Sequence, residues 1–198
     1  MSRMSVYLIT IHTYRSWSED NPRGYVQRGQ SGVQPPQPKL AEYRAGVATD
    51  PPVRFDRGQM RIAVETAREV CVNLGERPVA ASCTATHLHV LVELSTALTG
   101  RCSDSAPSRQ APSRQAPSRK GGAAPRGDKP VTPDSLCARI KSIVGLRLSE
   151  QLGTTGNRWF SRGKDIEPVK DDAHSRYLVG TYLPKHETHE GGIFAKWI

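Results

Sequence analysis

The chain has 198 residues, of which 24% are charged and 6% aromatic, with a formal net charge of +9 and an isoelectric point of about 9.7. This length fits one domain with a real core, and the basic balance favours a polyanionic partner such as a nucleic acid. The four cysteines form no C-x-x-C pair, which argues against a disulfide framework and against a cysteine zinc site.

The first quarter of the chain predicts one strand and a long loop, and a helix follows. The segment SVYLITIHTY (residues 5–14) is rich in β-branched and aromatic residues, as is typical of a strand. Polar sequence from Arg15 to about Phe55 contains PPQP and TDPP and predicts a loop. Residues 57–74 then place their apolar side chains on one stripe and end at Gly75, as an amphipathic helix does.

A β-hairpin is predicted after this helix. Pro78–Ala85 and His87–Leu94 are both short apolar segments, and each is typical of a buried strand. A tight turn at Thr86 joins them, so the two strands are expected to pair in an antiparallel manner.

A low-complexity segment follows the hairpin. A five-residue unit is repeated three times in APSRQAPSRQAPSRK, between Ala106 and Lys120, without periodic apolar positions. Residues 101–130 hold seven basic and two acidic residues, so more than half of the net charge lies here. We therefore predict a disordered insertion at about residues 97–131, within a single domain that spans residues 1–198.

A second helix is predicted from Thr132, an N-cap residue that is followed by Pro133 at the first helical position. Gly153 ends it. Its expected apolar face consists of Leu136, Ile140, Ile143, Val144, Leu148 and Leu152. Its more exposed faces carry three basic residues, which are Arg139, Lys141 and Arg147.

Two further elements complete the chain. Residues 158–161 predict a short strand, and a third helix is expected from about Asp171 to Leu183, capped by Asp171 or Asp172. Helices and strands are thus mixed, and a hairpin lies among the strands. This order predicts an α+β fold with an antiparallel sheet of four or five strands and helices packed on it.

Two histidines open the second strand of the predicted hairpin. His87 and His89 are separated by one residue, and side chains at i and i+2 of a strand point to the same face. They are either ordinary strand residues or ligands that present two ring nitrogens to one divalent cation. The sequence HETH, residues 186–189, lies near the C-terminus and could close over the pair.

The segment RPVAASCTATHLHVLVEL, residues 77–94, resembles the strand–turn–strand of the HUH single-strand endonucleases, which are named for a His-hydrophobic-His motif. Within this superfamily the chain is most similar to the single-tyrosine transposases, including the REP-associated tyrosine transposases. Members carry a tyrosine on a helix near the C-terminus and a polar, metal-binding residue four positions later. Tyr182 and His186 occupy those places. The segments WFSRG (159–163) and TYRSWSEDNPRGYV (13–26) also resemble parts of the family.

The resemblance implies an HUH-endonuclease-like fold and a metal-dependent, single-stranded DNA endonuclease and strand transferase. A metal on His87 and His89, with His186 as third ligand, would polarise the scissile phosphate. Tyr182 would attack phosphorus and form a 5′-phosphotyrosine intermediate. The implied partners are single-stranded DNA that forms hairpins and a second copy of the chain. The three basic residues of the second helix would contact phosphates.

The chain departs from the family pattern at two positions. Pro184 disfavours a helical conformation at Leu183, so the third helix is expected to end at Tyr182, and Tyr177 remains a rival nucleophile. His186 replaces an amide side chain. The family implies Mg²⁺ or Mn²⁺, whereas three imidazoles favour zinc or manganese over magnesium.

Two other functions fit the same residues. The first is a catalytically silent DNA or RNA hairpin-binding protein that is derived from a transposase. The second is a zinc-dependent hydrolase that uses water. The hydrolase ranks last because Glu93, on the same face as His87, lies six residues further along the strand. No apolar run reaches membrane length and no signal peptide is recognisable, so we expect a cytoplasmic protein without a membrane partner.

Overall fold

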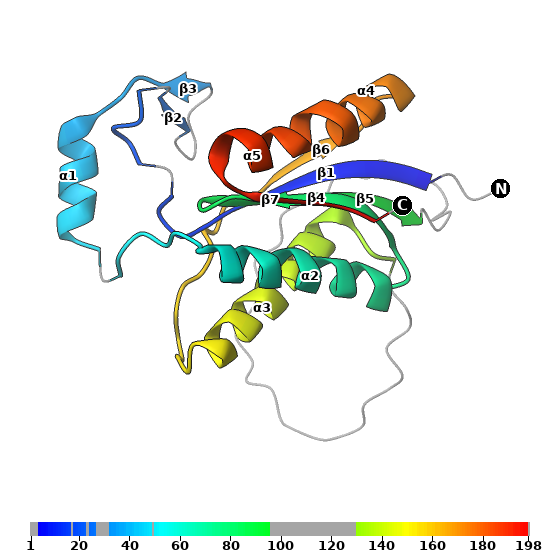
Figure 1. Cartoon of the computed structure of the whole chain (residues 1–198). Coiled ribbons are helices and arrows are strands. Elements are labelled where there is room, and N and C mark those ends of the chain that lie inside the picture. The colour runs from blue at the N-terminus through cyan, green and yellow to red at the C-terminus, as the bar shows by residue number, and fades with distance from the viewer. Residues whose placement is uncertain are drawn as a thin grey trace, which may run out of the picture.

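The computed structural model shows an α+β fold built on one antiparallel sheet of five strands (Figure 1). It describes residues 4–16, 18–22, 24–26, 32–48, 50–95 and 130–197. The sheet order is β6-β1-β5-β4-β7, with every neighbouring pair antiparallel. The strands in that order are β6 (Asp165–Pro168), β1 (Met4–His12), β5 (His87–Ser95), β4 (Arg77–Cys83) and β7 (Ile193–Lys196). The predicted class and sheet are confirmed, and most of the predicted insertion lies outside the described residues.

The predicted hairpin forms the centre of the sheet. β4 and β5 pair from Cys83↔Leu88 at the turn to Arg77↔Glu93, with a register shift between Pro78 and Ala80. β1 pairs along the whole other side of β5. Both strands beside β5 thus precede the segment 96–129, whereas the edge strands β6 and β7 follow it. β5 is therefore protected on both sides, and it carries the histidine pair.

Two long helices cover one face of the sheet (Figure 1). These are α2 (Arg57–Asn73) and α3 (Pro133–Gln151), and both begin with a capping box, at Asp56 and at Thr132. The sheet side chains buried against them alternate along the strands and are Ile9, Ile11, Ala81, Cys83, Leu88, Val90 and Val92. Both helices confirm the prediction, although Leu152 at the end of α3 is 48% exposed and does not belong to the buried face.

The C-terminal helical segment covers the other face. It consists of α4 (Asp172–Tyr177), a π-helical turn η1 (Leu178–Tyr182) and α5 (Leu183–Glu190). Leu178 and Leu183 pack on Leu8 of β1 and Leu91 of β5. Because strand side chains alternate, residues two and four positions from Leu91 on β5, namely His89 and His87, also face this segment.

The helix does not end at Tyr182, contrary to the prediction from Pro184. The N–H of Leu183 bonds to the carbonyl of Leu178, five residues earlier, which widens the helix by one residue at this point. Pro184 then lies in the first turn of α5, where its missing N–H costs little. The chain therefore continues as a helix to Glu190.

The prediction that the segment from Arg15 to Phe55 is a loop is wrong in part. It contains α1 (Pro38–Gly46) and a separate two-stranded sheet, β2 (Tyr25–Val26) with β3 (Val33–Gln34). Pro38 of the PPQP sequence starts α1 instead of preventing it, because the first helical position needs no N–H donor.

The strand predicted at residues 158–161 is also wrong. Phe160 makes one isolated bridge with Thr13, and the edge strand is β6, a few residues later. Proline is tolerated at the sheet edge, so Pro168 can end β6 without breaking a ladder. Among the described residues, none of the helices has both the length and the apolar character needed to cross a bilayer.

Candidate metal centre

Polar side chains gather on the α5 face of the three central strands, near the β4–β5 turn. His87 and His89 lie on β5, as the period of two requires. Across the ladders, His89 is opposite Thr10 of β1 and Ser82 of β4, and His87 is opposite His12. The floor of the site is therefore built by three neighbouring strands.

α5 supplies a third imidazole above this floor. The ring of His186 lies 5.1 Å from that of His87 and 4.7 Å from that of His89, measured between centroids. One ring nitrogen from each of the three histidines lies within 4.8 Å of the others. The structure therefore brings the three predicted ligands together, and they could hold one metal ion.

Unpartnered nitrogens show that the residues fit such an ion. His89 is 4% and His186 is 7% exposed. Within the described part of the chain, Nε2 of His89 and both ring nitrogens of His186 are buried without a hydrogen-bond partner. Each buried polar group without a partner costs roughly 1–3 kcal/mol, and a bound cation would remove that cost at the ligating nitrogens.

Threonine hydroxyls hold the strand histidines in one orientation. The Thr10 hydroxyl lies 2.8 Å from Nδ1 of His89, and Thr84 and Thr86 lie 3.1 and 3.0 Å from Nδ1 of His87. A hydroxyl that accepts a hydrogen bond from Nδ1–H leaves the Nε2 lone pair unprotonated. In the tautomer with the proton on Nδ1, these contacts prepare both Nε2 atoms as ligands.

Burial keeps the imidazoles of His87 and His89 neutral. Burial lowers the pKa of His87 to about 4, and the nearby imidazoles of His186 and His12 add to this effect while Glu190 opposes it. Burial, followed by the neighbouring imidazoles, holds the pKa of His89 well below its usual value. Neutral imidazole is the form that binds a metal, so the site is prepared for a cation at neutral pH.

Replacing Thr10 with valine is expected to weaken metal binding by about 10- to 100-fold, because removing a group that orients a ligand has effects of this size. Valine keeps the shape of threonine but loses the hydroxyl that contacts Nδ1 of His89. The measurement is a titration of metal-free protein with Zn²⁺ or Mn²⁺ against a competing chelator. Thr10→Ser retains the hydroxyl and should restore the affinity, and an unchanged affinity in Thr10→Val would contradict this role.

The metal-free protein is expected to lose stability as the pH falls from 6.5 to about 4. Unfolded His87 binds a proton near pH 6.5, whereas its pKa in the folded protein is about 4. Neutral His87 therefore makes its full contribution to the free energy of unfolding above pH 6.5. This contribution, on the order of 3 kcal/mol, is lost as the pH falls toward 4. Urea unfolding with a chelator at several pH values measures this.

The control for this pH dependence is a pair of substitutions. His87→Asn should reduce the loss of stability and leave the part that His89 contributes, whereas His189→Asn, at an exposed position of α5, should not change it. Parallel stability curves for the wild type and His87→Asn would contradict the assignment.

Glu190 is a site residue that sequence reasoning missed. Its Oε2 lies 3.4 Å from Nδ1 of His186 and 4.0 Å from Nε2 of His87. The spacing of four residues from His186 would have indicated a shared helix face, but only if α5 had been expected to continue past Pro184. Of the other HETH residues, Glu187 and His189 are exposed, and His189 lies outside the histidine cluster.

Tyr182, not Tyr177, lies beside the histidines. Its ring centroid is 5.5 Å from that of His89 and 5.2 Å from that of His186. Burial, and then the carboxylates of Glu167 and Glu190, raise the pKa of the Tyr182 hydroxyl. A nearby cation would lower it again. Tyr177 is 50% exposed, with its ring 6.4 Å from that of Tyr182.

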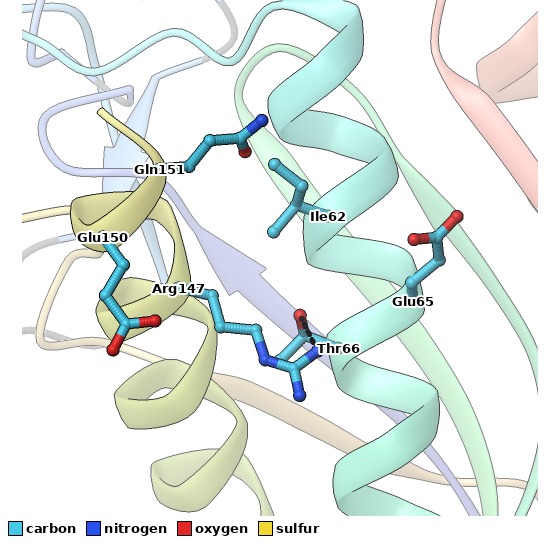
Figure 2. Close-up of a pocket in the computed structure, with 6 residues that line it drawn as sticks. All are labelled: Ile62, Glu65, Thr66, Arg147, Glu150 and Gln151. Carbon is cyan, nitrogen blue, oxygen red and sulfur yellow. Dashed lines mark hydrogen bonds between the residues drawn. The ribbon is translucent and has the colours of Figure 1, made fainter. Parts of the chain in front are cut away.

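The three basic residues of α3 lie away from the histidines. Arg147 points into a pocket between α3 and α2 and donates to the Thr66 hydroxyl (Figure 2). Its guanidinium also pairs with Glu69. The Lys141 ammonium donates to the carbonyl of Ser161 at 2.8 Å. Burial lowers the pKa of His12, and the Lys141 charge adds to this effect while Asp165 opposes it. Arg139 is exposed. α3 covers the opposite face of the sheet, and phosphate contact by these three residues stays a prediction.

No protein-family model matches this chain, and no curated protein matches it either.

Proposed function

We propose that the protein is a metal-dependent, single-stranded DNA endonuclease and strand transferase of the HUH single-tyrosine transposase type. One observation carries the proposal: the Tyr182 ring lies beside two of three clustered imidazoles that could hold a metal. A candidate nucleophile thus lies beside residues that could hold a metal, as a phosphoryl-transfer site requires.

The chemistry follows from these side chains. A divalent ion on the three histidines would supply positive charge for the scissile phosphate and for the Tyr182 phenolate. The Tyr182 oxygen attacks phosphorus, the bond from phosphorus to the 3′-oxygen breaks, and the tyrosine proton ends on that oxygen. The 5′-phosphate remains linked to tyrosine, so a later 3′-hydroxyl can reverse the step and join a new strand.

The fold supports the same assignment. The His-x-His pair lies on the central strand of an antiparallel sheet, and the tyrosine helix packs on the same face of that sheet. His186 follows Tyr182 by four residues, from the end of the π-helical turn into α5, so both side chains face the site. Mn²⁺ or Zn²⁺ suits three imidazoles better than Mg²⁺ does. The proposed partners are hairpin-forming single-stranded DNA and a second copy of the chain.

Covalent trapping tests the proposal. Purified protein is incubated with Mn²⁺ and labelled single-stranded DNA that carries the hairpins flanking its own gene, and the mixture is run on a denaturing gel. We expect a slower, denaturant-stable band that is absent when a chelator is added. If metal-loaded protein binds the hairpin DNA tightly but forms no adduct, the result would instead support the alternative function, a catalytically silent hairpin-binding protein.

A water-using metal hydrolase is the second candidate, and Glu190 favours it. The absence of a carboxylate close to the histidine pair was the reason to rank this function last, and Glu190 supplies one from α5. This candidate predicts cleavage that leaves no adduct and continues in Tyr182→Phe. The proposed transferase predicts a covalent adduct in the wild type and no cleavage in Tyr182→Phe.

A further inference from the structure

We propose that Glu190 is the fourth protein ligand of the metal centre, giving a site of three imidazoles and one carboxylate. This inference rests on the metal centre of the proposed function but not on its DNA chemistry. Within the described residues, Glu190 is the acidic residue whose carboxylate lies within 4.0 Å of a ligand histidine.

The distances match those between ligands of one ion. Zinc binds imidazole nitrogen and carboxylate oxygen at about 2.0–2.2 Å, so two of its tetrahedral ligand atoms lie roughly 3.3–3.5 Å apart. Oε2 of Glu190 is 3.4 Å from a ring nitrogen of His186 and 4.0 Å from Nε2 of His87. The distance to His186 already fits a shared ion, and the distance to His87 would have to shorten by about 0.5 Å.

The backbone fixes α5 above the site. Gly191 ends the helix in the left-handed region at φ 63°, and the N–H of Gly192 bonds to the carbonyl of His186 at 2.9 Å. A Cβ at Gly192 would lie 2.5 Å from the carbonyl oxygen of Cys83, at the end of β4. Only glycine permits this close approach, which holds the last turn of α5, and Glu190 with it, beside the β4–β5 turn.

Charge also favours a ligand role. Glu190 is the last residue of α5, where the carbonyl ends of the helix disfavour a carboxylate. A divalent ion would turn this unfavourable position into a favourable one, because a carboxylate partly neutralises a cation that is buried among neutral imidazoles. Three nitrogens and one oxygen are ligands that suit Zn²⁺ or Mn²⁺, and the scissile phosphate of the proposed function would then bind as a fifth ligand.

Metal binding without DNA tests the proposal. Metal-free protein is titrated with Zn²⁺ or Mn²⁺ against a competing chelator, in the wild type, Glu190→Gln and the matched control Glu187→Gln. Glu187 lies on the same helix and is exposed, as Glu190 is in part, with 48% of its side chain accessible. We expect one ion per chain, an affinity at least 10-fold weaker in Glu190→Gln, and an unchanged affinity in Glu187→Gln. The visible absorption of bound Co²⁺ should also change in Glu190→Gln alone, because it reports the ligand set.

The outcomes separate this proposal from the proposed function. Equal affinity and equal Co²⁺ spectra in the two glutamine variants would overturn the ligand role and leave Glu190 to act on a water molecule. A wild type that binds neither ion would overturn both the ligand role and metal dependence. Weakened binding in Glu190→Gln, with no DNA adduct in the wild type, would uphold the ligand role while the transferase function fails.

Discussion

Replacing Tyr182 with phenylalanine is expected to reduce covalent adduct formation at least ~10³-fold, because the substitution removes the attacking oxygen itself. The ring that contacts His89 and His186 stays in place. Since only one oxygen atom is lost from a half-buried side chain, the fold and the affinity for hairpin DNA should change little. Denaturing gels measure the adduct, and gel shifts with the same DNA measure binding.

Tyr177→Phe is the matched control, since it makes the same chemical change at the neighbouring tyrosine. Tyr177 is half exposed and lies further from the histidine cluster, so this variant should form the adduct at the wild-type level within about threefold. Loss of the adduct in Tyr177→Phe with retention in Tyr182→Phe would reassign the nucleophile. Cleavage without an adduct in the wild type and in both variants would instead support the hydrolase.

Replacing His89 with leucine is expected to abolish the stabilisation of the protein by metal. A ligand at about 100 times its dissociation constant adds roughly 2.7 kcal/mol to the free energy of unfolding. For a chain of this size, that raises the melting temperature by about 5–10 °C. Leucine keeps an apolar side chain in the buried position of His89 but offers no lone pair, so the shift should fall to near zero.

Thermal melts with and without Zn²⁺ or Mn²⁺ provide the measurement for His89→Leu. His189→Leu is the control, because His189 is an exposed histidine on α5, outside the cluster. This variant should keep the full metal-induced shift. A His89→Leu protein that is still stabilised by metal would show that the ion binds elsewhere.

The local sequence contained most of the information for the central part of the fold. The helices α2 and α3 are capped by Asp56 and Thr132. A capping box joins residues three positions apart, so the local sequence is enough to mark where these helices start. The β4–β5 hairpin needs only a short turn between two apolar segments. The period of two along β5 likewise placed His87 and His89 on one face.

Other features depend on contacts between distant parts of the chain. The edge strands β6 and β7 are four residues each, and they form because β1 and β4 offer unpaired edges. The contact between Thr10 and His89 joins residues 79 positions apart and has no sequence signature. The position of Arg147, between two helices on the far side of the sheet, likewise follows from packing.

The C-terminal helix shows most clearly where sequence and tertiary structure divide. The sequence by itself determined that two histidines share a strand face and that His186 follows Tyr182 by four residues. Because of Pro184, local rules predicted a helix end at Tyr182, but burial of Leu178 and Leu183 on the sheet keeps the helix continuous through a π-helical turn. Packing energy of this kind outweighs a local preference. Only the tertiary structure therefore decided that Tyr182 and Glu190 both reach the histidines.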